Sequence, residues 1–133
     1  MSYTFDLRVY YEDTDAGGIV YHANYLCFAE RARTEFLHKL GMSNHKMLSE
    51  DIGIVVSRLE IDYKQPAFLE DKLTVETSVL KIGAATMLLK QDIKRKDDLI
   101  ASLKVSIAFI RVSEKRPIRI PPELRSKFEM YLE

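Results

Sequence analysis

One long segment of this sequence, from Asn24 to Leu40, repeats its apolar residues with the period of an α-helix. The apolar stripe consists of Tyr25, Phe28, Ala29, Ala32, Phe36, Leu37 and Leu40. Charged residues fall mostly off this stripe, so the spacing predicts an amphipathic helix with one buried face. Asn24 is expected to be its N-cap and Gly41 its C′ residue. At about 1.5 Å per residue, such a helix is about 25 Å long, enough to cross a five-stranded sheet.

Four other segments alternate apolar and polar residues, which is the period of a half-buried antiparallel strand. Their apolar positions are Tyr3, Phe5, Leu7, Val9 and Tyr11, then Val55, Leu59, Ile61 and Tyr63, then Leu73, Val75 and Val79, and finally Leu99, Leu103, Val105, Ile107 and Phe109. A further strand is predicted at 87–93, after a Gly-Ala-Ala break, and is expected to pair as a hairpin with the strand before it. The sequence therefore predicts five strands and a single long helix.

The predicted elements follow one another as one strand, a glycine-containing loop, the long helix and four strands in a meander. Shorter helices are expected at 43–50 and from Pro122 onward. This order is typical of the α+β class. Because there is no internal repeat and no linker rich in Pro, Gly or Ser, residues 1–133 are expected to form one domain. One helix covers only one face of a sheet and leaves the edge strands open, so a homodimer or homotetramer is expected.

The composition excludes several classes of protein. Twenty basic and twenty acidic residues cancel, which argues against a nucleic-acid-binding protein. No apolar run approaches the roughly 20 residues of a membrane span, and the first residues carry none of the features of a signal peptide. Cys27 is the only cysteine and is expected to be a small packing residue inside the long helix. A cytoplasmic protein without a membrane span is therefore expected.

Three carboxylates and two glycines precede the predicted long helix, in the stretch Glu-Asp-Thr-Asp-Ala-Gly-Gly at 12–18. Glycines allow positive φ angles and a close approach of the backbone to a ligand, and the N–H groups of the next helical turn point at any oxygen placed there. The helix dipole favours an ionised carboxylate at the same place, which suits a base or a nucleophile. The alternative from the residues alone is a turn that Asp13 and Asp15 simply cap.

The ordered string from Asp13 to Tyr25, Asp-Thr-Asp-Ala-Gly-Gly-Ile-Val-Tyr-His-Ala-Asn-Tyr, closely resembles the signature of the hotdog-fold acyl-CoA thioesterases. It is most similar to the branch associated with the Tol-Pal system (the YbgC type) and is also similar to 4-hydroxybenzoyl-CoA thioesterase. The resemblance extends over nearly the whole chain and implies a hotdog fold, with a five-stranded antiparallel sheet wrapped around one long central helix. It places the catalytic aspartate at Asp15 and puts His22 where the Tol-Pal-associated branch has histidine.

The resemblance also implies a reaction, namely hydrolysis of the thioester of short-chain, long-chain or aromatic acyl-CoA, with Asp15 as nucleophile or general base. Backbone N–H groups near Tyr21 and His22 are expected to hold the developing negative charge. The expected substrate-binding residues are Tyr21, Gly17, Gly18, Asn24 and Tyr25. No metal or cofactor is expected. Three alternatives stay open: thioesters of acyl carrier protein as substrates, a dehydratase or hydratase of the same fold, and a non-catalytic module that binds an acyl thioester or a protein.

Overall fold

The structure, a computed structural model, describes residues 1–133. Its elements, in chain order, are β1 (Tyr3–Arg8), the short 3-10 helix η1 (Tyr11–Asp13), α1 (Asn24–Lys39), α2 (Asn44–Ser49), β2 (Ile52–Tyr63), β3 (Lys72–Ile82), β4 (Thr86–Arg95), β5 (Asp98–Arg111), β6 (Arg116–Pro117) and α3 (Pro122–Glu129). Every helix and strand predicted from the sequence is present, but β1 is shorter than predicted, because Tyr11 lies in η1 and not in the strand. Only η1 and the two-residue β6 were not predicted.

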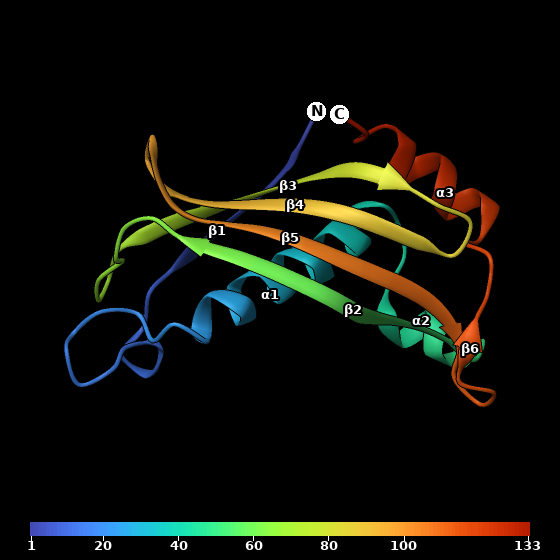
Figure 1. Cartoon of the computed structure of the whole chain (residues 1–133), viewed down its shortest axis with the longest axis horizontal. Helices are drawn as coiled ribbons and strands as arrows, with labels where there is room; N and C mark the ends of the chain where they lie inside the picture. Colours follow the sequence, from blue (N-terminus) through green and yellow to red (C-terminus); the bar gives the residue numbers. More distant parts are fainter.

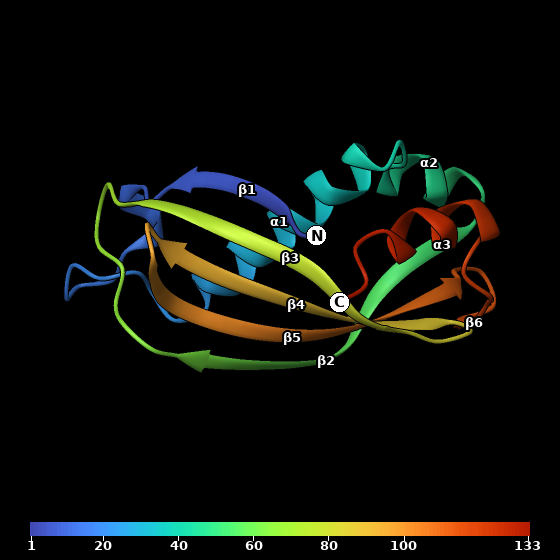
Figure 2. The ribbon, with the colours of Figure 1, turned by 90° about the horizontal axis from the view of Figure 1, so that it is seen from above.

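The strands form one antiparallel sheet in the order β1-β3-β4-β5-β2, with β6 paired to β5. The long helix α1 lies along one face of this curved sheet, and α2 and α3 lie near one end of it (Figure 1, Figure 2). The core that these elements enclose contains 27 buried apolar residues. The predicted hotdog architecture, a five-stranded antiparallel sheet around one long helix, is therefore confirmed.

The long helix α1 buries six residues of its predicted apolar stripe, and the seventh, Leu40, is buried directly after the end of the helix. Gly41 follows its last turn with a φ of 80°, as expected of a C′ glycine. The helix begins one residue earlier than predicted, with Ala23 as its N-cap, and the side chain of Asn24 bonds elsewhere. Cys27 is exposed rather than packed, because it lies off the apolar stripe. None of the three α-helices is long and apolar enough to cross a membrane.

The strand order corrects the predicted meander, because β2 and β3 are consecutive in the chain but lie on opposite sides of β4 and β5. Residues 64–71, called the crossover loop below, connect them at one end of the sheet (Figure 1). Three strand spacings amount to about 14 Å, a distance that an eight-residue segment can span. Alternation along a strand predicts its buried face but not its neighbours, so the sequence pattern could not reveal this crossing.

A β-bulge at Ser57 changes which residues of β2 face the core. The register against β5 shifts between Val56 and Arg58, so one extra residue is inserted there. Leu59 packs against the core as predicted, but Val55 points to the other face and is 41% exposed. The prediction for Val55 was wrong because a one-residue insertion reverses the face of every residue before it.

Candidate active site

The loop between η1 and α1 folds back on itself and presents Asp15 to solvent. Thr14 and Val20 pair as an isolated antiparallel bridge, and the N–H of Asp15 donates to the carbonyl of Ile19 at 2.9 Å. Gly18 closes the turn with a φ of 80°, a conformation that a residue with a Cβ atom adopts only at a cost. Residues 14–20 therefore form a tight surface turn, called the glycine turn below.

Two aspartates in this loop have opposite surroundings. Asp13 is only 2% exposed, and its carboxylate accepts hydrogen bonds from the side-chain amide of Asn24 at 3.0 Å and from the N–H of Tyr10 at 2.8 Å. Asp15 is exposed. Its Oδ1 atom accepts from the N–H of Gly17 at 2.8 Å, while its Oδ2 atom accepts no hydrogen bond from the protein. Asp13 therefore anchors the loop, whereas Asp15 keeps a free oxygen that can react.

Asp15 lies in an open hollow of about 340 Å³ at the start of α1. The hollow is lined by Asp15, Ile19, Val20, His22, Tyr25, Tyr63, Lys64, Gln65 and Pro66. These residues come from the glycine turn, the start of α1, and the end of β2 with the crossover loop that follows it. Of the residues predicted for the site, the structure gathers Asp15, His22 and Tyr25 around this hollow. The other predicted residues do not line it: Gly17, Gly18, Tyr21 and Asn24.

Backbone N–H groups at the start of α1 are free to bind an oxygen, but the N–H of Tyr21 is not among them. It donates to the carbonyl of Asp13 at 2.9 Å, because the loop folds back onto the helix start. The N–H groups of His22, Ala23 and Tyr25 donate to no acceptor in the protein. The hydroxyl of Tyr63 donates to the carbonyl of His22 at 2.9 Å and so fixes the peptide that carries the Ala23 N–H. These N–H groups are therefore the donors that the helix start offers to a ligand.

Tyr25 joins the start of α1 to the crossover loop. Its side chain is buried and packs edge-on against the ring of Tyr63, with 5.6 Å between the ring centroids. Its hydroxyl accepts a hydrogen bond from the N–H of Ala67 at 3.1 Å. Burial raises the pKa of Tyr25 above its ordinary value, and the Ala67 N–H opposes this in part. The phenol is therefore neutral at physiological pH and forms a fixed wall of the hollow.

Comparison with known proteins identifies the family. The model of the thioesterase-like superfamily matches residues 9–128, which include every residue that lines the hollow. The chain belongs to the thioesterase-like superfamily.

Relatives within this superfamily cover nearly the full chain. The chain is 42% identical to the acyl-CoA thioesterase YbgC of Haemophilus influenzae over 127 residues, which are 95% of this chain and 93% of that protein. It is 33% identical to the acyl-CoA thioester hydrolase YbgC of Escherichia coli, with 96% of each covered. The crystal structure of a probable thioesterase from Bartonella henselae is similar with a TM-score of 0.86 and 36% identity, over 91% of this chain and 100% of that one. The expected family, fold and enzyme class, a hotdog thioester hydrolase, are therefore confirmed.

Several residues that line the hollow were not predicted as site residues: Ile19 and Val20 before α1, and Tyr63, Gln65 and Pro66 after it. At the end of β2 the one signal in the sequence is Pro66, which follows the alternating pattern of β2 and is typical of a strand end. No local pattern indicates that the end of β2 meets the start of α1. That meeting depends on the crossing of the chain from β2 to β3, which brings residues distant in sequence to one place.

Proposed function

We propose that this chain hydrolyses acyl-CoA thioesters with Asp15 as its catalytic carboxylate. The observation that carries the proposal is an exposed Asp15 oxygen without a hydrogen-bond partner, in the same hollow as His22, at a helix start whose first N–H groups include free donors. A carboxylate and an oxyanion site suffice for this reaction, because a thiolate, with a thiol pKa of about 8.5, leaves readily. Relatives named as acyl-CoA thioesterases support the same substrate class.

The proposed reaction places the oxygen of the thioester carbonyl against the N–H groups of His22 and Ala23. Their partial positive charge polarises the carbonyl and stabilises the oxyanion that develops. Asp15 then either attacks the carbonyl carbon, expelling the thiolate and leaving a mixed anhydride that water cleaves, or takes a proton from a water that attacks the same carbon. Both routes consume one water and release a free acid and CoA. The His22 side chain is proposed to orient the substrate or this water.

The other predicted site residues are proposed to shape and support the site around Asp15. Gly17 and Gly18 shape the glycine turn, since Gly17 donates its N–H to the Asp15 carboxylate and Gly18 supplies the positive φ. Asn24 and Tyr25 hold the loops on the two sides of the helix start. Tyr21, which is 46% exposed, is proposed to contact the acyl group. This group is short-chain, long-chain or aromatic, and a substrate panel distinguishes the three.

We further propose that the chain acts as a homodimer or homotetramer in the cytoplasm. β2 is an edge strand that pairs only with β5, and three of its apolar side chains are exposed: Val55, Val56 and Tyr63. A free apolar edge is a surface on which a second copy of the chain can pair. Because Tyr63 also lines the hollow, a partner at this edge would lie beside the site. The cytoplasmic assignment rests on the single Cys27, which has no disulfide partner within the chain.

The proposal is tested by free-thiol release from short, long and aromatic acyl-CoA esters and from a thioester of acyl carrier protein. The parent is compared with Asp15→Asn and with Asp97→Asn, a matched control, because Asp97 is an exposed aspartate in the turn between β4 and β5. We expect the parent to hydrolyse at least one acyl-CoA, Asp15→Asn to lose most of kcat, and Asp97→Asn to keep it. An inactive parent or a fully active Asp15→Asn variant refutes the proposal and favours the binding module. Hydrolysis confined to the carrier-protein thioester refutes acyl-CoA as the substrate.

A further inference from the structure

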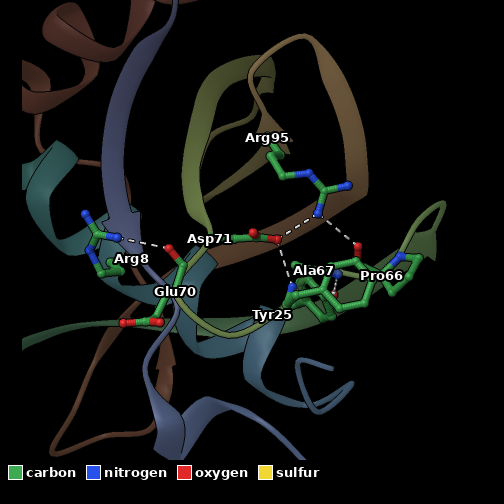
Figure 3. Close-up of polar contacts among 8 residues, drawn as sticks. Arg8, Tyr25, Pro66, Ala67, Glu70, Asp71 and Arg95 are labelled. Carbon is green, nitrogen blue, oxygen red and sulfur yellow. Dashed lines mark hydrogen bonds and ion pairs between the residues drawn. The ribbon is translucent and has the colours of Figure 1, made fainter. Parts of the chain in front are cut away.

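The crossover loop is tied to the rest of the molecule by Arg95, the last residue of β4 (Figure 3). The Nη1 atom of Arg95 donates to Oδ2 of Asp71 at 2.7 Å and to the carbonyl of Pro66 at 3.2 Å. Both side chains of this ion pair are mostly buried, since Arg95 is 26% exposed and Asp71 is 23% exposed. One guanidinium group therefore binds the beginning and the end of the loop together.

Asp71 extends this clamp to the middle of the loop. The same Oδ2 atom that pairs with Arg95 also accepts the N–H of Phe68 at 2.8 Å. The guanidinium carbon lies 5.8 Å from the centroid of the Phe68 ring, within the range of a cation–π contact. The positions of Pro66, Phe68 and Asp71 are thus set by one charged pair that is partly shielded from solvent.

The clamped segment forms contacts on both sides of the catalytic machinery. Ala67, between Pro66 and Phe68, donates its N–H to the hydroxyl of Tyr25 at 3.1 Å (Figure 3). Its carbonyl accepts the N–H of Val20 at 2.9 Å. Phe68 forms an isolated bridge with Ile19, the residue whose carbonyl accepts the N–H of Asp15. Ala67 and Phe68 therefore connect the crossover loop to both the glycine turn and the start of α1.

We propose that Arg95 is a positioning residue for thioester hydrolysis, which fixes the distance between the Asp15 carboxylate and the N–H groups at the start of α1 through the crossover loop. Arg95 does not line the hollow, so it acts through Pro66 and Asp71 rather than on the substrate. Misplacement of reacting groups by about 1 Å can reduce a rate by about 100-fold, so a loosened loop is expected to reduce kcat more than it changes KM. The inference rests on the proposed function.

The test compares Arg95→Met and Arg95→Lys with Arg125→Met. Arg125 is a matched control because it also donates to a loop carbonyl, that of Gly83 at 2.7 Å, and pairs with a carboxylate, that of Glu129 at 3.5 Å. It belongs to α3, at the opposite end of the molecule from the glycine turn (Figure 1). Each variant is assayed with one acyl group as its CoA ester and as its N-acetylcysteamine ester, which has no phosphates. Thermal melting reports the folding of each variant.

We expect Arg95→Met to lower kcat about tenfold or more on both esters with a KM change below about threefold. Arg95→Lys keeps the charge opposite Asp71 and is expected to recover part of kcat, while Arg125→Met keeps a kcat close to that of the parent. If Arg95→Met fails to fold, Asp71→Asn is used in its place to test the inference. The asparagine side chain has an oxygen that can still accept the Phe68 N–H, whereas the ion pair with Arg95 is lost.

Three results would overturn the inference. The first is a kcat of Arg95→Met, or of Asp71→Asn where that variant decides, within about twofold of the parent. The second is an equal loss of kcat in Arg125→Met, which would indicate a general effect of destabilisation. The third is a loss confined to the CoA ester and expressed in KM, which would make Arg95 a phosphate contact. In each case the activity of the parent and the inactivity of Asp15→Asn would leave the proposed function standing.

Discussion

Replacing Asp13 by alanine is expected to lower the stability of the protein, whereas replacing Asp15, only two positions away, is expected to abolish activity with little change in stability. Asp13→Ala removes the acceptor of the Asn24 amide and of the Tyr10 N–H inside a nearly closed environment. A hydrogen bond to a charged group contributes about 1.5–3 kcal/mol, and water can replace part of the bond to the exposed Tyr10, so the loss is about 3 kcal/mol in total. For a domain of 133 residues this corresponds to a decrease in Tm of about 10 °C.

The contrasting substitution, Asp15→Ala, removes one hydrogen bond at an exposed turn, where water can serve the N–H of Gly17 instead. Its free energy of unfolding is expected to stay within about 1 kcal/mol of the parent, while thioesterase activity is lost. Thermal melting and thiol release, measured on both variants, test the pair of expectations. A Tm of Asp13→Ala equal to that of the parent, together with a marked decrease for Asp15→Ala, would show that the assignment of structural and catalytic aspartate is reversed.

Three other substitutions test Tyr25, which lines the hollow, and the two glycines of the turn before α1. Tyr25→Phe leaves the buried N–H of Ala67 without its acceptor and is expected to cost about 2 kcal/mol at neutral pH. Because burial raises the pKa of Tyr25 in the folded state, its contribution to stability is complete below the unfolded value of about 10 and is lost as pH rises through the folded value. In urea unfolding above about pH 10, the free energy of unfolding should therefore fall less steeply with pH in Tyr25→Phe than in the parent. Equal slopes in the two proteins would contradict this expectation. Gly17→Ala places a Cβ atom 3.2 Å from Oδ1 of Asp15 and is expected to lower kcat severalfold. Gly18→Ala, whose Cβ meets nothing within 4 Å, is expected to lower the free energy of unfolding by about 1 kcal/mol through its φ of 80°. Thiol release and thermal melting test the pair: a loss of kcat in Gly18→Ala alone, with a loss of stability in Gly17→Ala alone, would refute both expectations.

Much of the secondary structure was predictable because its signals are local. The stripe from Tyr25 to Leu40 is buried as its spacing predicts, since a helix brings residues three and four positions apart to one face. Gly41 ends the helix for an equally local reason, its freedom to adopt a positive φ. The inward face of β2 was predictable only after its bulge, because an inserted residue such as Ser57 leaves no mark in an alternating pattern.

The candidate site was likewise predictable from the sequence only where its residues are close together in the chain. Asp15, His22 and Tyr25 lie within one short stretch of chain, so the sequence by itself determined that they come together at a helix start. It did not determine that Asp13 is buried with both oxygens bonded, because that depends on how the loop folds back onto the helix.

Only the tertiary structure decided which strands are neighbours and what closes the site. β2 and β3 separate around β4 and β5, and the crossover loop between them supplies a wall of the hollow and the clamp formed by Arg95 and Asp71. A strand's alternation specifies the face that it buries, and many pairings satisfy that requirement equally well. The pairing that forms is the one that buries the core as a whole, and that is a property of distant segments together.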